Sequence, residues 1–363
     1  MSSCAHGADT PLVREEVSLQ IEVGTHAGPI RRIASDARAD IVVTASDDKT
    51  ARVWRLSTRE LLRTLRVPVG TADEGRLYGV AIDPSGATVA IGGTAVGRGD
   101  RQSRRAEILI FDINTGQLRQ RIRAAEGEIK RLVWSADGAL LFAGTSGPRS
   151  AVLAFDSAGK QVLNHSMTGA VYGLAAGREG MLAATDFSGA VQLFKAIGAT
   201  VEPIKRLSTP SRGPVSVALS PDSGHAVVGY FASQRPTIIE LATGRSVRTL
   251  EPRDRDIDSG YLMTVAWSRN GKDVYAAGAT KKASGAYGVW RFDAESGESR
   301  AFVAAASDSI LDLSWSDDTR LLFASFDASW GIAEGDKLKA QVCPPFPICA
   351  GPMGCAWIAT ARW

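Results

Sequence analysis

The stretch Ser46–Trp54 (Ser-Asp-Asp-Lys-Thr-Ala-Arg-Val-Trp) constrains the fold more than any other part of this chain. It combines an aspartate-containing turn with an alternating strand that a tryptophan closes, and another alternating strand precedes it. Because His26-Ala27-Gly28 opens the same unit, residues 26 to about 65 are predicted to form one four-stranded sheet. Such a sheet cannot bury both of its faces alone, so one clear unit predicts a ring of them, a β-propeller.

A strand–turn–strand pattern recurs along the chain, with a turn that resembles Ser-Pro-Asp-Gly. Clear copies are Leu77–Gly86 and Ile129–Gly138, and the third strands of several units end in an aromatic residue such as Phe111. Each residue type favours this turn for a physical reason: Pro presets φ, Asp or Asn caps its own backbone and Gly accepts positive φ. The pattern predicts seven units, beginning near residues 26, 75, 127, 169, 212, 260 and 307. An ordinary β-sandwich is the alternative, and the nearly fixed spacing argues against it.

These units resemble those of WD40-repeat proteins over residues 17–342. The narrower similarity is to bacterial WD40 regions of proteins that also carry caspase-like or TIR-like effector domains. It is carried by Thr44–Trp54, Leu61–Leu65 and Glu74–Tyr78. This chain contains no recognisable effector domain, so the resemblance transfers only the propeller: an all-β, seven-bladed WD40-type ring.

The resemblance also implies a buried hydrogen-bonded tetrad in the first blade, formed by His26, Ser46, Asp48 and Trp54. In such a relay Asp48 orients His26, and the histidine meets a hydroxyl that reaches the indole N–H, so every polar group has a partner. A Ser-His-Asp set is also the signature of a hydrolase, but a structural role is the stronger prediction for this position. Blade 4 carries Ser188 and Phe194 where Asp and Trp are needed, so it is expected to rely on packing alone.

Both ends of the chain differ from the repeats. Residues 1–16 are expected to be a flexible segment, whereas Val17–Val23 alternates and is a candidate outer strand that closes the ring on the last blade. A free edge strand is the alternative for these residues. The tail 343–363 is expected to be irregular. A one-base frame shift can convert residues 353–363 into propeller-turn sequence, so the tail is hypothesised to derive from a frame shift that truncates a longer protein.

Bulk composition restricts the function classes only weakly. The 42 basic and 39 acidic residues nearly cancel, which gives no reason to expect a nucleic-acid or membrane partner. No apolar run reaches the length of a membrane span, and the first residues lack the apolar core of a signal peptide. Three of four cysteines lie in the last 21 residues, at a Cys-x5-Cys-x5-Cys spacing that does not suit zinc. We therefore expect a soluble cytoplasmic protein without a cofactor or a metal.

The binding residues are predicted from the family. In WD40 proteins the residues that flank the start of each innermost strand point to one face of the ring, the top face. The corresponding residues here are Arg31, Arg76, Tyr78, Lys130, Tyr172, Tyr261, Met263 and Leu311. Tyr and Arg are typical of binding hot spots, although these side chains could instead pack between blades.

Two long connections add positive charge near the same face. Arg98, Arg101, Arg104 and Arg105 form a basic loop in the second unit, and Lys281 and Lys282 lie in the sixth. These loops could receive an acidic peptide, a phosphorylated partner or a nucleic-acid backbone. Nucleic acid is disfavoured, because no aromatic residue is interleaved with the arginines. A solvated loop without a partner is the alternative.

The sequence thus predicts a non-enzymatic scaffold or sensor that binds a protein or peptide on the top face, with a caspase-like or TIR-like effector as the partner suggested by resemblance. A propeller hydrolase with a metal in its channel is the second possibility, but Glu128 and Asp308 alone are too few ligands, and no catalytic residue is assigned. A truncated fragment without function is the third. The sequence does not predict an oligomeric state.

Overall fold

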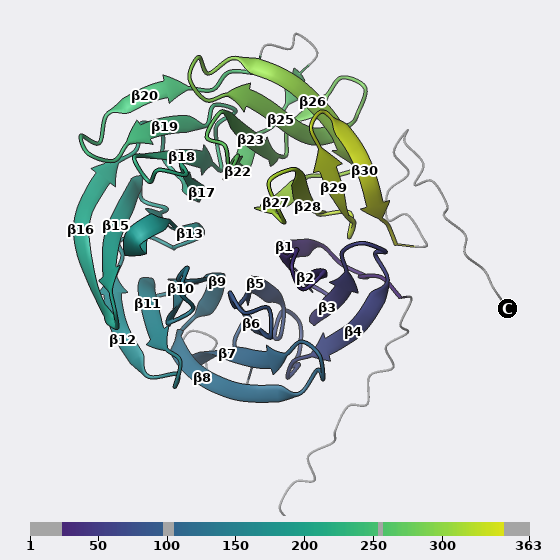
Figure 1. The fold of residues 1–363 in the computed structure, drawn as a ribbon, viewed down its shortest axis with the longest axis vertical. Coiled ribbons are helices and arrows are strands. Elements are labelled where there is room, and N and C mark those ends of the chain that lie inside the picture. Colours follow the sequence, from purple (N-terminus) through teal and green to yellow (C-terminus); the bar gives the residue numbers. More distant parts are fainter. Residues whose placement is uncertain (1–23, 97–104, 253–256, 345–363) are drawn as a thin grey trace, which may run out of the picture.

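The computed structural model describes residues 24–96, 105–252 and 257–344. Seven antiparallel sheets are arranged radially around a central axis, and each is built from strands that follow one another in the chain (Figure 1). The molecule is therefore an all-β, seven-bladed propeller, as the sequence predicts. Each blade begins within a few residues of its predicted start.

The strands of each blade run from the axis outward in chain order. Blade 1 comprises β1 (Ile30–Asp36), β2 (Ile41–Ser46), β3 (Thr50–Arg55) and β4 (Leu61–Arg66). Blade 2 comprises β5 (Leu77–Ile82), β6 (Thr88–Gly93), β7 (Arg105–Asp112) and β8 (Leu118–Glu126). Blade 3 comprises β9 (Glu128–Trp134), β10 (Leu140–Ser146), β11 (Ala151–Asp156) and β12 (Gln161–Ser166). Blade 4 comprises β13 (Leu174–Ala176), β14 (Met181–Asp186), β15 (Ala190–Ile197) and β16 (Thr200–Ser208), with the short 3-10 helix η1 (Arg178–Gly180).

The remaining blades follow the same plan. Blade 5 comprises β17 (Pro214–Leu219), β18 (His225–Tyr230), β19 (Thr237–Glu240) and β20 (Ser246–Thr249). Blade 6 comprises β22 (Leu262–Trp267), β23 (Asp273–Gly278), β25 (Tyr287–Asp293) and β26 (Ser299–Ala306), extended by β21 (Ile257–Ser259) and β24 (Lys281–Lys282). Blade 7 comprises β27 (Ile310–Trp315), β28 (Arg320–Ser325), β29 (Trp330–Glu334) and β30 (Lys337–Val342).

The turns between first and second strands form as their residues predict. In blade 3 the Ser135 hydroxyl donates to Asp137 at 2.6 Å and accepts from the backbone N–H of Leu140 at 2.9 Å. Gly138 takes a φ of 71°, in the left-handed region that favours glycine. These local contacts fix where each hairpin reverses, and therefore where each blade begins.

The core consists of seven apolar clusters, one at each junction between neighbouring blades. Strand β2 shows how a single strand supplies two of them. Its side chains alternate, so Val43 packs towards blade 2 and the adjacent Val42 packs towards blade 7. Both valines are fully buried, which explains why the second strands read as continuous apolar runs instead of alternating ones.

The ring closes differently from the sequence-based prediction. Blade 7 takes all four of its strands from residues 310–342, so β30 occupies the outer position that we assigned to Val17–Val23. Residues 17–23 themselves lie outside the described residues. In the described part of the chain, blades 1 and 7 meet through packing, with the rings of Trp54 and Trp330 at a centroid distance of 5.7 Å. Of the tail 343–363, residues 345–363 also lie outside the described residues.

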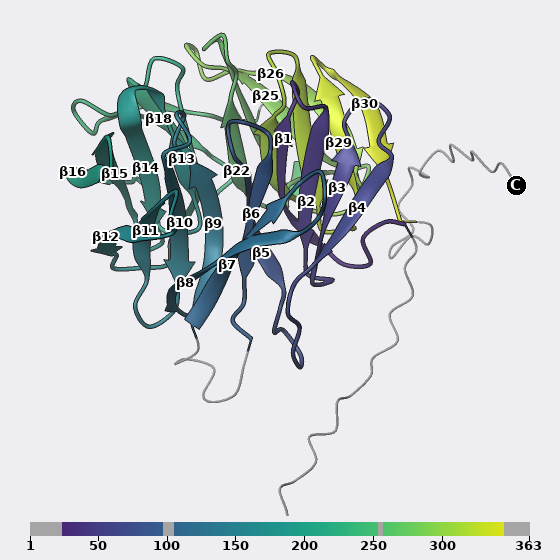
Figure 2. The same ribbon diagram turned by 60° about the horizontal axis from the view of Figure 1, so that its bottom comes forward.

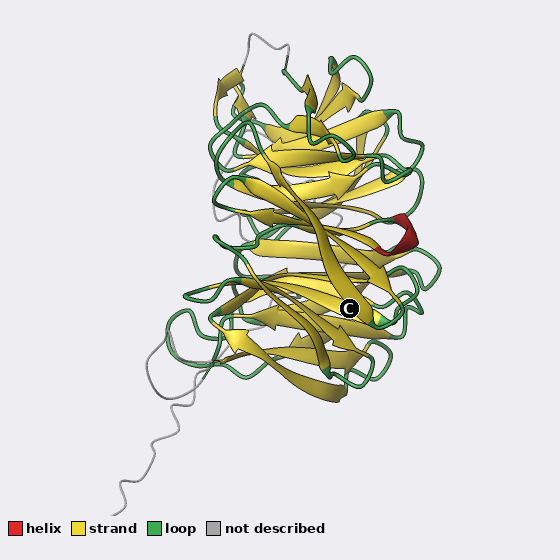
Figure 3. Cartoon of the chain, turned by 90° about the vertical axis from the view of Figure 1, so that its left-hand side faces the viewer, coloured by secondary structure: helices red, strands yellow, loops and turns green. Residues whose placement is uncertain are grey.

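Viewed obliquely and from the edge, the propeller is a disk whose connections gather on its two faces (Figures 2 and 3). The top face carries the start of each first strand and the connection between the second and third strands. The only helical segment in the described residues is η1, which is three residues long, so no described helix is long enough to cross a membrane.

Candidate functional site

A β-bulge at the top of the first strand recurs around the ring. In six blades the ladder between the first and second strands skips one residue near its start. A bulge re-aims the side chain it carries and is frequent next to functional sites. The skipped residues are Arg31, Tyr78, Lys130, Val215, Met263 and Leu311. Tyr172 precedes β13 at the corresponding place in blade 4.

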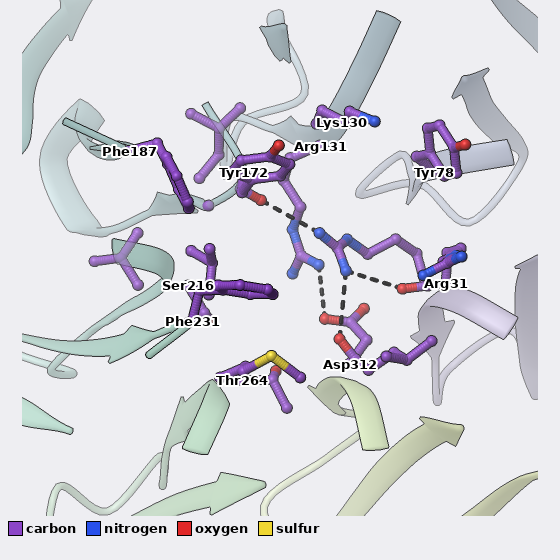
Figure 4. A pocket seen from close by; sticks show the side chains of 17 residues that line it. Arg31, Tyr78, Lys130, Arg131, Tyr172, Phe187, Ser216, Phe231, Thr264 and Asp312 are labelled. Atoms are coloured by element: carbon purple, nitrogen blue, oxygen red, sulfur yellow. Dashed lines mark hydrogen bonds and ion pairs between the residues drawn. The ribbon is translucent and has the colours of Figure 1, made fainter. Parts of the chain in front are cut away.

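These seven side chains surround a cavity of about 390 Å³ at the axis on the top face (Figure 4). The residue after the bulge also lines the cavity in five blades, as Arg32, Arg131, Ser216, Thr264 and Asp312, and Gly173 lines it from the corresponding position of blade 4. Phe187 and Phe231 complete the wall from the connections that follow β14 and β18. The cavity is therefore built by repetition, with equivalent positions of successive blades converging on one point.

Six of the eight predicted binding residues line this cavity, namely Arg31, Tyr78, Lys130, Tyr172, Met263 and Leu311. The other two lie outside its lining. Arg76 forms an ion pair with Asp73 at 3.0 Å, and Tyr261 stacks on Phe231 with a centroid distance of 6.2 Å. Binding of a partner by these residues stays a prediction.

Little of the basic loop falls within the described residues. Arg98, Arg101 and Arg104 lie outside them, and Arg105 is the exposed first residue of β7. In blade 6, Lys281 and Lys282 form β24, and the Lys282 ammonium lies 4.8 Å from the ring centroid of Phe302. The role of these basic residues stays a prediction.

One side of the top face carries an arc of aromatic rings. Tyr172 contacts Phe187 edge-on, with 5.5 Å between the ring centroids. The centroid of Phe187 lies 6.4 Å from that of Phe231, and Phe231 stacks on Tyr261. Phe187, Phe231 and Tyr261 remain 38%, 55% and 42% exposed. The arc therefore presents ring surface to solvent across blades 4 to 6.

The other side alternates cations with aromatic rings. The Arg31 guanidinium lies 5.5 Å from the ring of Phe326 and 5.9 Å from that of Tyr78. The Lys130 ammonium lies 3.9 Å from the Tyr78 ring and 6.0 Å from the Tyr172 ring. Cations over ring faces at such distances are attracted by the ring quadrupole. Together with the arc, these contacts form a continuous belt through all seven blades, from Phe326 through Arg31, Tyr78, Lys130, Tyr172, Phe187 and Phe231 to Tyr261, called the belt below.

The floor of the cavity is a polar cluster that joins blades across the axis. Arg131 of blade 3 donates to Asp312 of blade 7 at 2.7 Å, and Asp312 also accepts from the backbone N–H of Ile33 at 3.1 Å. Arg32 of blade 1 donates to the carbonyls of Leu311 and Tyr172, each at 3.3 Å. Burial, followed by the positive charges of neighbouring arginines, lowers the pKa of Arg32 to about 10 although Asp312 opposes this.

Sequence reasoning missed six residues of the belt and the floor. Arg32, Arg131 and Asp312 each directly follow a predicted position, so extending that pattern by one residue would have found them. Phe187, Phe231 and Phe326 had a different signal, since a phenylalanine stands directly after the second strand in blades 4, 5 and 7. Such a large apolar residue in a turn has no core to fill, and its recurrence indicates a surface role.

The tetrad of blade 1 is present with a different hydroxyl. His26 meets Asp48 through Nδ1 at 2.7 Å and Thr44 Oγ1 through Nε2 at 2.7 Å, and the Trp54 indole donates to the same Thr44 oxygen at 2.9 Å. The assignment of Ser46 is therefore wrong. Ser46 donates to the carbonyl of Gly28 at 2.9 Å instead. Residues 44 and 46 point to the same face of β2, so alternation alone could not separate them.

Blade 4 has Phe194 in place of the tryptophan, but the expectation that it relies on packing alone is wrong. In blade 4 the buried Asp186 accepts the backbone N–H groups of Thr168 at 3.1 Å and Ser188 at 3.0 Å, and Arg206 donates to it at 2.8 Å. In blade 7 Asp327 accepts from the N–H groups of Ser307 and Ser329, as Asp48 does from Ala27 and Thr50 in blade 1. An aspartate thus pins the top of the second hairpin in several blades.

Hydrogen bonding assigns the proton on His26. An ionised Asp48 can only accept, so Nδ1–H donates to it, and in a neutral histidine Nε2 is then left to accept from the Thr44 hydroxyl, which itself accepts from Trp54. Burial lowers the pKa of His26 despite the opposing effect of Asp48. Although burial alone would raise the pKa of Asp48, hydrogen bonds that include the one from His26 lower it to about 2. The relay is therefore a neutral histidine beside an ionised aspartate at pH 7.

We expect this relay to make stability depend on pH. An unfolded histidine has a pKa near 6.5, and folding lowers it, so below about pH 6.5 the unfolded chain binds more protons. The free energy of unfolding should consequently fall as the pH drops from 7.5 to 5.5, and the His26→Asn variant should show a smaller fall. Thermal melts at the two pH values measure this, and equal slopes for both proteins would contradict it.

Comparison with known families identifies part of the ring. The model of the WD domain, G-beta repeat (WD40), matches residues 18–55. No curated protein matches the chain. Together with the seven blades, the repeat match supports a WD40-type propeller. Within the described residues, no group of three or more His, Cys, Asp or Glu side chains is placed to hold a metal ion.

Proposed function

We propose that this chain is a non-enzymatic scaffold or sensor that binds a protein or peptide through the cavity and belt on its top face. WD40-type propellers commonly mediate protein–protein interactions and are generally non-enzymatic. The single observation that carries the proposal is the belt, in which every blade contributes a ring or a cation to one continuous surface.

The distribution of exposed apolar residues supports this choice of face. Among the large hydrophobic side chains that stay exposed in the described residues, the aromatic ones are Phe187, Phe231, Tyr261 and Phe326, and all four belong to the belt. Stability alone does not favour exposed rings that gather at one place. Clusters of exposed aromatic residues beside a cavity are typical of binding surfaces.

Nothing in the described residues favours the hydrolase alternative. Glu128, one of the two acidic residues considered for a channel metal, forms an ion pair with Lys130. The histidine of the Ser-His-Asp set is buried in the tetrad and does not line the cavity. The similarity to WD40 regions of caspase-like and TIR-like effector proteins stays a prediction, because the family match concerns the repeat alone.

Capture of partners from the native host tests the proposal. We expect the Phe187→Ala/Phe231→Ala variant to lose at least 10-fold in capture, because hot-spot rings each contribute about 2 kcal/mol or more. The matched control is Ile204→Ala/Leu338→Ala, which removes two exposed apolar side chains from the outer strands β16 and β30. Circular dichroism and melting should show that both variants fold. Equal capture by both variants would contradict the proposal.

A further inference from the structure

The charges around the cavity do not balance. Four basic side chains line it, those of Arg31, Arg32, Lys130 and Arg131, against the single acidic side chain of Asp312. Three of the four have an acidic partner, and the three pairs differ in where that partner lies.

Two cations are neutralised from outside the cavity wall and one from within it. Arg31 makes two hydrogen bonds to Asp47, at 2.9 and 2.6 Å, and Lys130 pairs with Glu128. Arg131 pairs with Asp312. Each of these cations therefore already has its counter-charge.

Arg32 is the exception among the described residues. Its guanidinium donates to three backbone carbonyls, including that of Arg31 at 2.9 Å, and forms no ion pair with a described carboxylate. Its Nε is buried without a hydrogen-bond partner. Carbonyl dipoles do not cancel a full charge, so about one positive charge remains uncompensated in the cavity.

The polar and apolar parts of the site lie at opposite sides of the cavity. Figure 4 shows Phe187 and Phe231 at one side and Arg31 and Tyr78 at the other. Val215 and Met263 add apolar surface from blades 5 and 6. An occupant that fits must therefore offer an anion and an apolar group next to each other.

Resting on the proposed function, we propose that the partner inserts a peptide segment in which an acidic side chain stands next to an aromatic or aliphatic one. The carboxylate is placed near Arg32 and Lys130, and the apolar side chain packs against Phe187 and Phe231. The volume of 390 Å³ lies at the low end of the usual range for ligand pockets, which suits one or two side chains of such a segment.

Two other chemistries fit less well. A phosphorylated residue carries about −1.5 to −2 charges at pH 7, more than the single spare positive charge balances. A lysine or methylated lysine would be repelled, and the face of Tyr78 that could attract it already holds Lys130 at 3.9 Å. A carboxylate therefore fits the cavity best.

A peptide display library panned on the intact chain tests this, with Phe187→Ala/Phe231→Ala as the counter-screen. Peptides that need the two rings and carry Asp or Glu beside an apolar residue support the inference. Peptides that need the two phenylalanine rings but lack an acidic residue, or are rich in Lys and Arg, overturn the inference and leave the proposed function standing. If no selected peptide needs the two phenylalanine rings, the proposed function itself is overturned.

A synthetic series based on one enriched peptide then measures how much the negative charge of the peptide contributes to binding. The protein is used unmodified, so that no variant needs to fold. Replacing its acidic residue by the matching amide should weaken binding about 10-fold or more, as for a charge-assisted hydrogen bond. A phosphoserine at the same position should bind more weakly than the acid. Equal affinity of acid and amide, or tighter binding of the phosphopeptide, overturns the inference.

Discussion

Replacing Asp312 with asparagine is expected to lower the free energy of unfolding by about 3 kcal/mol. The carboxylate is 4% exposed, and it is the acidic partner of Arg131, which is itself only 25% exposed. Its other oxygen accepts the backbone N–H of Ile33, across the junction between blades 7 and 1. Breaking a buried pair from one side leaves an uncompensated charge and costs about 3 to 5 kcal/mol. Urea unfolding monitored by tryptophan fluorescence measures the loss.

Two further variants separate the charge effect from a general loss of packing. The exposed pair between Lys339 and Glu334 serves as a control, since Glu334→Gln should cost less than about 1 kcal/mol. In Arg131→Gln/Asp312→Asn the unpaired arginine is also removed, so the double variant should be less destabilised than Asp312→Asn alone. Losses of the same size for Asp312→Asn and Glu334→Gln would contradict the account.

Thr44→Val is expected to destabilise the propeller by about 2 to 4 kcal/mol, because two buried polar atoms lose their partner. His26 Nε2 and Trp54 Nε1 both meet the Thr44 hydroxyl, and each unsatisfied group costs about 1 to 3 kcal/mol. Valine keeps the shape of threonine, so little packing is lost. The free energy of unfolding from urea titration is the measurement.

Ser46→Ala is the matched comparison. Ser46 donates to the carbonyl of Gly28 and accepts from the N–H of Asp48 at 3.1 Å. The serine is buried, but both partners are backbone groups of partly exposed residues, so we expect a loss of about 1 kcal/mol. A larger loss for Ser46→Ala than for Thr44→Val would restore the serine to the tetrad.

The fold could be predicted because its signals are local. Turns such as Ser135–Gly138 are specified within a few residues, and seven of them at nearly regular spacing leave few alternatives to a ring. The closure of the ring, in contrast, depends on which strand pairs with the last blade, and no short sequence pattern specifies this. The alternation of Val17–Val23 fits an outer strand, but β30 follows β29 directly in the chain and occupies that position. A short hairpin connection forms more readily than pairing between distant ends of the chain.

Of the candidate site, the sequence predicts residues of the belt but not those of the floor. Family geometry locates Tyr78 and Lys130, because every blade starts in the same way. The floor depends on contacts that no short pattern contains. Arg32 reaches the carbonyl of Tyr172, 140 residues away, and Arg131 reaches Asp312, 181 residues away. Such partners become neighbours only after the ring has formed around them.

The most direct test of the central claim is to locate the contact with the partner. A photoreactive benzoylphenylalanine at Phe231, 55% exposed on the top face, is compared with one at Ile204, 51% exposed on the outer strand β16. After irradiation in the native host, we expect a defined cross-linked partner from position 231 and none from position 204. A partner that cross-links from position 204 and not from position 231 would show that binding occurs at the outer edge of the propeller and would contradict the account.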